Sequence, residues 1–323
     1  MLPSIPPTDQ QFLANMQQIG DQITQAVSQL SSGRQINQPS DEPDQISPLL
    51  TAVANLDQTQ QIETNLGNVS TEASTADTAL SDSVQLFDQL VTAGTQGATG
   101  TQDPAQRQSL GTQVETYLEQ LVSLAGTQIN GRYIFSGDSD TVAPYTLIQP
   151  PVDADGTTPP TEVSDYAGSD STRQIMQANG SLFAVAQTAQ QIFDNPNASA
   201  FQAVTDLRDA LNNVPTVPQT DPDYGTQYDA QTAQINTALQ EVQAAQDQIG
   251  QSLAFYGIVE NEITSATSFA SNQATVQQEQ LSAVEDADPT TAIMNLDQAT
   301  TQQQEAYEAF AKVPTKTLFD YLG

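Results

Sequence analysis

Carboxylates are the most abundant ionisable groups in this sequence, and they are the first candidates for chemistry. The chain has 39 Asp and Glu against 7 Lys and Arg, and it contains no His, Cys or Trp. Close pairs such as Asp138 with Asp140, or Asp153 with Asp155, could act as acid and base or bind Ca²⁺. Asp153 lacks the further ligands and the closing Glu of an EF-hand loop, and pairs arise by chance among so many carboxylates. We therefore expect no catalytic residue, no cofactor and no metal site.

The missing residue types and the formal charge of −32 exclude several classes of protein. Without His and Cys there are no common zinc ligands, no thiolate nucleophile and no Ser-His-Asp triad. The negative charge repels phosphate, so we expect neither nucleic acid nor an anionic membrane as a partner. No run approaches the roughly 18 apolar residues of a transmembrane helix, and residues 1–7 lack the basic and apolar regions of a signal peptide. We therefore predict a protein that is not an enzyme.

Regularly spaced apolar residues near both ends predict helices that could pair. The first stripe recurs at steps of three and four and consists of Phe12, Met16, Ile19, Ile23, Val27 and Leu30. Gly33 is suited to end this helix, and Ser40 could cap the next one, with Asp41 in its first turn. Asp288 and Pro289 have the spacing of an N-cap and first helical residue. The last stripe contains Ile293, Leu296, Phe310 and Val313.

Long helices are predicted between the two ends, with a change of character in the middle. One stripe runs from Leu49 to Val91, and Gly94, Gly97 and Gly100 then suggest a flexible turn. Asp103 and Pro104 open a helix that is expected to reach Ile129. After a β-prone segment, helical spacing resumes at Leu182, Val185 and Ile192 and again from Phe201 to Leu211, and a long helix carries apolar residues from Tyr228 to Val284.

The expected fold class is mainly α with a small β-rich insertion, built as a long antiparallel helical bundle or coiled coil. We expect residues 1–43 and 286–323 to form a terminal helical domain, residues 44–135 and 198–285 a bundle of long helices, and residues 136–197 a small β-rich inserted domain. An isolated helix of about 20 residues is marginal in water. Both ends are therefore predicted to be disordered in a free subunit and to order on assembly.

Several segments together resemble the bacterial flagellin superfamily. The N-terminal signature spans residues 30–43 and includes Gly33, Arg34, Asn37, Pro39 and Asp41. The C-terminal part is similar at residues 292–296 and 311–322. The block at residues 130–138, with Arg132, Tyr133, Phe135 and Gly137, looks more like the branch of this superfamily that forms the junction between hook and filament, as does the segment at residues 166–175.

The resemblance implies a folded-back chain whose first and last helices pair, with a β-containing domain inserted in the middle. It implies a structural subunit that assembles outside the cell into a ring, adapts the hook lattice to the filament, and contacts a hook-associated protein on one side and flagellin or a second junction protein on the other. It further implies export by the flagellar type III apparatus without a cleaved signal peptide, and a cytoplasmic chaperone that holds the C-terminal helix.

Two alternatives stay open at this point. The nearer one is a flagellin that forms the filament itself, and the more distant one is a free-standing extracellular coiled-coil scaffold or adhesin. Arg132, beside Tyr133 and Phe135, could contact a neighbouring subunit or form a cation–π pair.

Overall fold

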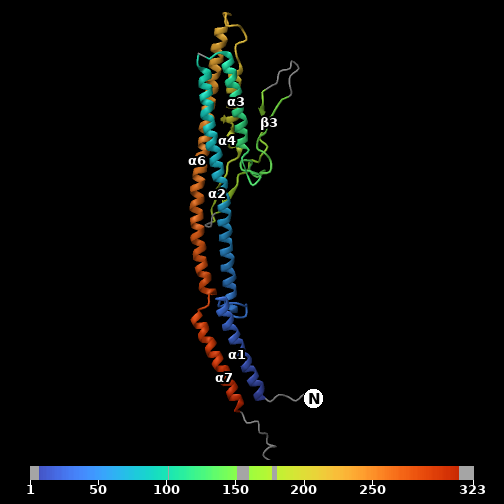
Figure 1. The fold of residues 1–323 in the computed structure, drawn as a ribbon, viewed down its shortest axis with the longest axis vertical. Helices are drawn as coiled ribbons and strands as arrows, with labels where there is room; N and C mark the ends of the chain where they lie inside the picture. Colours follow the sequence, from blue (N-terminus) through green and yellow to red (C-terminus); the bar gives the residue numbers. More distant parts are fainter. Residues whose placement is uncertain (1–6, 101, 151–159, 177–179, 313–323) are drawn as a thin grey trace, which may run out of the picture. The chain divides into compact units, whose positions relative to one another are not determined.

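The computed structural model describes residues 7–100, 102–150, 160–176 and 180–312, and these are mainly helical, as predicted (Figure 1). The long helices are α1 (Pro7–Ser32), α2 (Pro43–Ala98), α3 (Pro104–Ala125), α6 (Tyr224–Glu285) and α7 (Pro289–Ala311), and the shorter ones are α4 (Ala189–Phe193) and α5 (Ala200–Asn212). The chain forms two compact units: residues 1–60 with 271–323, and residues 61–270. The boundary therefore falls within α2 and α6, whereas the sequence places it at residues 43/44 and 285/286.

The strands between α3 and α5 form four separate antiparallel pairs. They are β1 (Gln128–Ile129) with β2 (Arg132–Tyr133), β3 (Leu147–Ile148) with β4 (Glu162–Val163), β5 (Gln174–Met176) with β6 (Leu182–Ala184), and β7 (Asp194–Asn195) with β8 (Ala198–Ser199). Pairs this short are unstable alone and need to pack on other elements.

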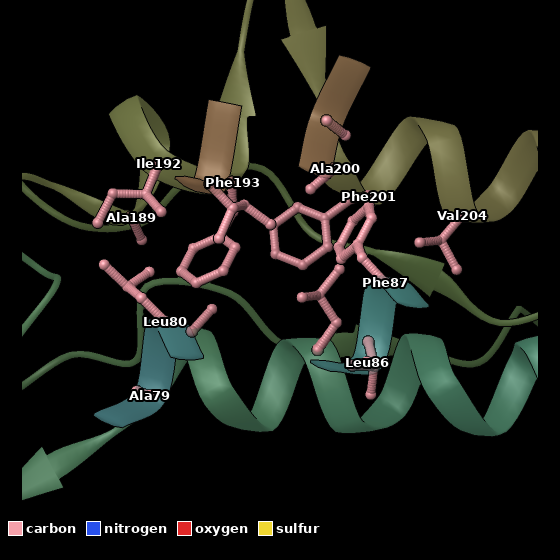
Figure 2. Close-up of a cluster of buried hydrophobic side chains, with 14 of the residues drawn as sticks. Ala79, Leu80, Leu86, Phe87, Ala189, Ile192, Phe193, Ala200, Phe201 and Val204 are labelled. Atoms are coloured by element: carbon pink, nitrogen blue, oxygen red, sulfur yellow. The ribbon is translucent and has the colours of Figure 1, made fainter. Parts of the chain in front are cut away.

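The core of the larger unit joins the helices to the segment that contains the strands. Figure 2 shows Leu80 and Phe87 of α2 gathered with Ile192 and Phe193 of α4 and Phe201 of α5. The rings of Phe193 and Phe201 lie 6.0 Å apart. Buried residues of the intervening segment, such as Tyr145 and Val185, belong to the same cluster as the buried residues of α2 and α6. The segment at residues 136–197 therefore shares the core of the bundle.

Local capping confirms where two of the predicted helices begin. The Asp103 side chain accepts a hydrogen bond from the Gln106 N–H, the Gln106 side chain accepts one from the Asp103 N–H, and Pro104 is the first residue of α3. Asp288 accepts from the Thr290 N–H, with Pro289 next in the chain. Each cap satisfies backbone donors that have no partner inside the helix.

Of the three glycines expected in a turn, only Gly100 lies in one; Gly94 and Gly97 are helical, because α2 continues to Ala98. A Cβ at Gly94 would lie 2.5 Å from Leu239 Cδ2, and one at Gly97 would lie 2.3 Å from Leu211 Cδ2. These glycines therefore leave room for leucines of α6 and α5 against the α2 backbone. Glycine is unfavourable in a helix but is tolerated where another element must come this close.

Three further expectations for local structure are also wrong. Ser40 and Asp41 lie in the loop before α2, which begins at Pro43, and Asp41 instead accepts from the N–H groups of Asn37 and Gln38. Ile129 is in β1, because α3 ends at Ala125. Leu182 is in β6 and not in a helix, since a two-strand ladder with β5 takes its backbone hydrogen bonds.

Candidate subunit interface

Helices α1 and α7 lie side by side and antiparallel in the smaller unit (Figure 1). Phe12, near the start of α1, stacks on Phe310, near the end of α7, with ring centroids 4.1 Å apart. Tyr307 meets the same Phe12 ring edge-on at 6.5 Å. The predicted pairing of the N- and C-terminal helices is thus present. Three aromatic rings pack together where the start of α1 meets the end of α7.

Small and amide side chains line the space between α1 and α7. Ala26, Ala292 and Ala299 are the residues of these two helices that are buried. A groove of about 550 Å³ runs between the helices, and its walls include Gln22, Gln25, Gln29, Asn295, Gln298 and Gln302. Alanine buries little apolar area compared with leucine or phenylalanine. Among the described residues of α1 and α7, no large apolar side chain is fully buried.

Most of the predicted assembly residues are only half-buried or are exposed. Phe12, Met16, Ile19, Ile23 and Leu296 are half-buried, whereas Val27, Leu30, Ile293 and Phe310 are exposed. Val313 lies outside the described residues. Leu13, Met294 and Tyr307 are exposed as well, at 55%, 66% and 56%. These three residues are not among the assembly residues predicted from the sequence. Leu13 and Met294 directly follow stripe residues along the chain, and this position could have identified them.

The first signature segment connects the end of α1 to the junction between α6 and α7. Gly33 has a φ of +71°, which ends α1 in the left-handed region, and its carbonyl accepts from the Ala287 N–H. The Arg34 guanidinium pairs with Glu285 at 2.8 Å, and the Gln35 N–H donates to the Glu285 carbonyl at 2.6 Å. These contacts join the N-terminal and the C-terminal parts of the smaller unit.

Side chains inside the same segment fix the shape of its loop. The Asn37 side chain donates to the Arg34 carbonyl at 2.9 Å, and Asp41 Oδ2 accepts from the backbone of Asn37 and Gln38. Pro39 lies within this loop and is exposed. Asn37 and Asp41 therefore shape the loop that follows α1.

The second signature segment attaches the strands to the bundle. Asn130 and Gly131 both have positive φ, at 53° and 77°, which makes the two-residue β1–β2 turn of the type that matches strand twist. Gly137 also has a positive φ, and a Cβ there would lie 2.3 Å from the Ser169 carbonyl oxygen. Phe135 is fully buried and packs edge-on against Phe193 and Tyr256.

Arg132 pairs with the Asp140 carboxylate at 2.8 Å and is itself largely exposed. Next to it, the Tyr133 N–H donates to the Asp140 carbonyl. Of the two alternatives for Arg132, the cation–π pair is therefore not what the described residues show: the guanidinium forms an ion pair with Asp140 instead. Tyr133 itself is half-buried in β2.

A buried ion pair connects α3, α5 and the residue before β4. Arg208 of α5 is nearly fully buried; its Nη1 lies 2.8 Å from Glu115 and donates to the Thr161 carbonyl, and its Nε lies 2.8 Å from Asp209. Burial acts to raise the pKa of Glu115, but hydrogen bonds from Thr161 and Arg208 and the charge of Arg208 outweigh it and lower that pKa. This arrangement is a structural connection.

Arg107 of α3 is also buried, and its hydrogen bonds go to neutral groups. It donates to Gln231 Oε1 at 2.6 Å and to Thr232 Oγ1 at 2.9 Å, and its guanidinium carbon lies 3.8 Å from the centre of the Tyr228 ring. It therefore fastens the start of α3 to α6. Over the described residues, no group of three or more acidic side chains is arranged to hold a metal ion.

None of the helices in the part of the chain that the structure describes is both long and apolar enough to cross a membrane.

The long helices, their connecting loop and the strand-bearing insertion together define a structural protein of the flagellin type. Residues 8–140 match the bacterial flagellin N-terminal helical region, and residues 230–322 match the bacterial flagellin C-terminal helical region. The chain belongs to the bacterial flagellin family. It is accordingly a structural component of the extracellular flagellum and not an enzyme, as the sequence predicts.

Individual relatives agree with this assignment. The chain is 26% identical over 312 residues to the flagellar hook-associated protein 3 of Escherichia coli, covering 90% of both chains. Its fold is similar to that of hook-associated protein 3 from Legionella pneumophila, with 14% identity, a TM-score of 0.60, and 72% and 98% of the two chains covered. It is also similar to FlgL from Xanthomonas campestris, with 14% identity, a TM-score of 0.57, and 72% and 99% covered.

Proposed function

We propose that this chain is the structural subunit of the hook–filament junction, where it adapts the hook lattice to the filament. The observation that supports this most is the match to hook-associated protein 3 along 90% of both chains. The match includes the strand-bearing segment as well as the terminal helices, so it is not limited to what flagellins share at their ends. One solved relative from Legionella pneumophila is described as a flagellar junction protein, with a similar fold at a TM-score of 0.53.

The surface proposed for self-association in a ring is the outward face of α1 and α7. It carries large apolar side chains that are exposed and make no ring contact between the two helices: Leu13, Val27, Leu30, Ile293 and Met294. Large apolar side chains gathered at an exposed surface are typical of a site of association. Neighbouring subunits would bury these side chains and so add stabilisation to the contact between α1 and α7.

The pairing of α1 with α7 is proposed to be marginal in a free subunit and to become firm on assembly. Among the described residues of α1 and α7, the large apolar side chains are at most half-buried, and an isolated helix of this length is marginal in water. Amide hydrogen exchange on the monomer tests this. We expect fast exchange at residues 10–30 and 290–312 and slow exchange in α3 and α5. Strong protection at both ends would contradict folding coupled to assembly.

The remaining partners follow from the same proposal. A hook-associated protein lies on the hook side, and flagellin or a second junction protein lies on the filament side. Export is proposed to proceed through the flagellar type III apparatus. A cytoplasmic chaperone is proposed to hold the C-terminal helix, which presents exposed Ile293, Met294 and Phe310 before assembly.

Deletion of the gene tests the proposed function and separates it from the alternatives. We expect cells with hooks but no filaments, with flagellin lost to the medium. Absence of both filaments and shed flagellin would instead indicate that this chain is the filament-forming flagellin. Intact filaments would contradict both roles and favour a free-standing scaffold.

Complementation of the deletion strain tests the proposed surface. The double substitution Ile293→Gln with Met294→Gln removes two exposed apolar side chains of α7 and is expected to leave hooks without filaments. Leu182→Gln is the control, because Leu182 is 63% exposed but lies in β6 of the other unit. Restored filaments with the double variant would contradict the assignment of this face.

A further inference from the structure

An open hollow of about 540 Å³ lies in the larger unit beside the buried guanidinium of Arg208. One wall comes from α3, with Gly111, Thr112 and Glu115, and another from α5, with Arg208 and Asn212. A volume of this size is in the range of sites that hold a small ligand. The polar groups along the walls decide which kind of ligand fits.

The Arg208 guanidinium has hydrogen-bonding capacity left over. Its side chain is only 3% exposed; the Nε donates to Asp209, and the Nη1 donates to Glu115 and to the Thr161 carbonyl. A guanidinium has five N–H donors, so the two on Nη2 remain. Among the residues that the structure describes, Nη2 has no acceptor. The hollow that Arg208 lines gives a ligand access to these two donors.

Asn212, the last residue of α5, offers a second free polar group. A Cβ at Gly111 would lie 2.3 Å from Asn212 Oδ1, so the Asn212 amide lies directly over the glycine of α3. Over the described ranges this amide has no hydrogen-bond partner. A side-chain amide has two donors and an acceptor. Gly111 therefore makes room for a group that can hydrogen-bond a ligand in either direction.

The charges around the hollow select against an anion and against a purely apolar ligand. Glu115 and Asp209 place two negative charges beside the single positive charge of Arg208, and the chain has a net charge of −32. An apolar ligand would leave Nη2 and the Asn212 amide without partners. No group of three or more acidic side chains in the described part of the chain is placed to hold a metal ion. The class that fits is a neutral ligand whose groups both donate and accept.

We propose that this hollow binds a neutral saccharide through Nη2 of Arg208 and the amide of Asn212. Each sugar hydroxyl both donates and accepts hydrogen bonds, so it can pair with Nη2 and with either end of the amide. The Thr112 hydroxyl donates to the Gln108 carbonyl, and its oxygen can accept from a further sugar hydroxyl. A peptide is typically recognised along a sheet edge or in an apolar groove, and this polar hollow between two helices is neither. Saccharide binding here is independent of the proposed role at the junction.

Titration of the full-length chain, followed by NMR, tests the class of ligand. The neutral probes are the methyl glycosides of glucose, galactose and mannose, and we expect at least one to bind with a dissociation constant on the order of 1 mM. Glucuronate, which adds a carboxylate to the same ring, is expected to bind at least about fivefold more weakly than the glucoside. Binding of none of the glycosides, or glucuronate binding as tightly as the glucoside, would overturn the inference. Tighter binding of N-acetylglycinamide than of every glycoside would overturn it in favour of a peptide.

Two variants and a matched control test whether binding takes place in the hollow. Asn212→Ala removes the free amide, and Gly111→Ala puts a Cβ where that amide lies while favouring the helix. Each is expected to weaken glycoside binding about fivefold or more. Asn261→Ala is the control, because this exposed amide of α6 donates to the Gly257 carbonyl of its own helix, and unchanged affinity is expected. Circular dichroism checks that the helices of each variant are intact. Equal affinity of all three variants and the wild type would overturn the inference.

Discussion

The ring of Phe12 in α1 stacks on the ring of Phe310 in α7, with the ring planes inclined by 17°. The two residues are nearly 300 positions apart in the sequence, so this contact exists only when the two ends of the chain meet. Tyr307 meets the same Phe12 ring edge-on, so three aromatic rings pack together at this end of the α1–α7 pair.

Phe310→Ala is expected to weaken the pairing of α1 with α7. An aromatic pair contributes about 1 kcal/mol beyond its buried area. Its loss is therefore expected to lower the equilibrium constant for pairing of α1 with α7 roughly fivefold, which speeds amide exchange in α7. Exchange rates at residues 290–310 measure the effect. Phe269→Ala is the matched control, since Phe269 of α6 is exposed to a similar degree, 48% against 43% for Phe310. Equal changes in α7 for both variants would argue against the stack.

Glu115→Gln is expected to destabilise the larger unit in a pH-dependent way. Arg208 loses one of its two carboxylate partners but keeps Asp209 and the Thr161 carbonyl, so the cost at pH 7 is about 1–2 kcal/mol. Because the folded-state pKa of Glu115 is lowered, its contribution is present above the ordinary value of 4.5 and is lost as the pH falls through the folded-state pKa.

Urea unfolding at several pH values measures this difference. The gap in unfolding free energy between the wild type and Glu115→Gln is expected to be full at pH 7 and to shrink in acid, as the pH falls below the ordinary pKa of 4.5 and through the lowered folded-state pKa. A gap that stays constant, or that widens in acid, would contradict the ionised role of Glu115.

Two glycines of the same helix are expected to respond in opposite directions to alanine. Gly94→Ala places a Cβ against Leu239 and Leu207 and is expected to destabilise the chain by about 1–2 kcal/mol. Gly67 has open space around the position of a Cβ, so Gly67→Ala is expected to stabilise it by about 0.5–1 kcal/mol through helix propensity. The urea midpoints of the two variants measure this, and a shift in the same direction would contradict the close approach at Gly94.

Arg107→Lys is expected to destabilise the chain although it keeps the charge. A lysine cannot donate to both Gln231 and Thr232 while lying flat against Tyr228, so the cost is about 1–2 kcal/mol. Arg132→Lys is the control, because this exposed arginine has an ion pair that a lysine can replace, and a change below about 0.5 kcal/mol is expected. Thermal unfolding of both variants decides between these outcomes.

The sequence by itself determined the features that depend on neighbouring residues. Asp103 with Pro104 and Asp288 with Pro289 begin helices as predicted, because a cap needs only a carboxylate and the N–H groups two or three residues further on. Gly33 ends α1 because its own backbone reaches the left-handed region. The helical class and the flagellin family also followed from spacing and signature residues.

The tertiary structure decided the features in which distant segments meet. Gly94 and Gly97 look like a turn in the sequence, but they are helical. The absence of a Cβ lets Leu239 and Leu211 pack against the backbone of α2 at these positions. Leu182 forms a strand because β5 is available to pair with it. The same is true of α1 and α7: a spacing of three and four identifies an apolar stripe, but only the tertiary structure shows that Ala26, Ala292 and Ala299 are buried while Ile293 and Met294 are exposed.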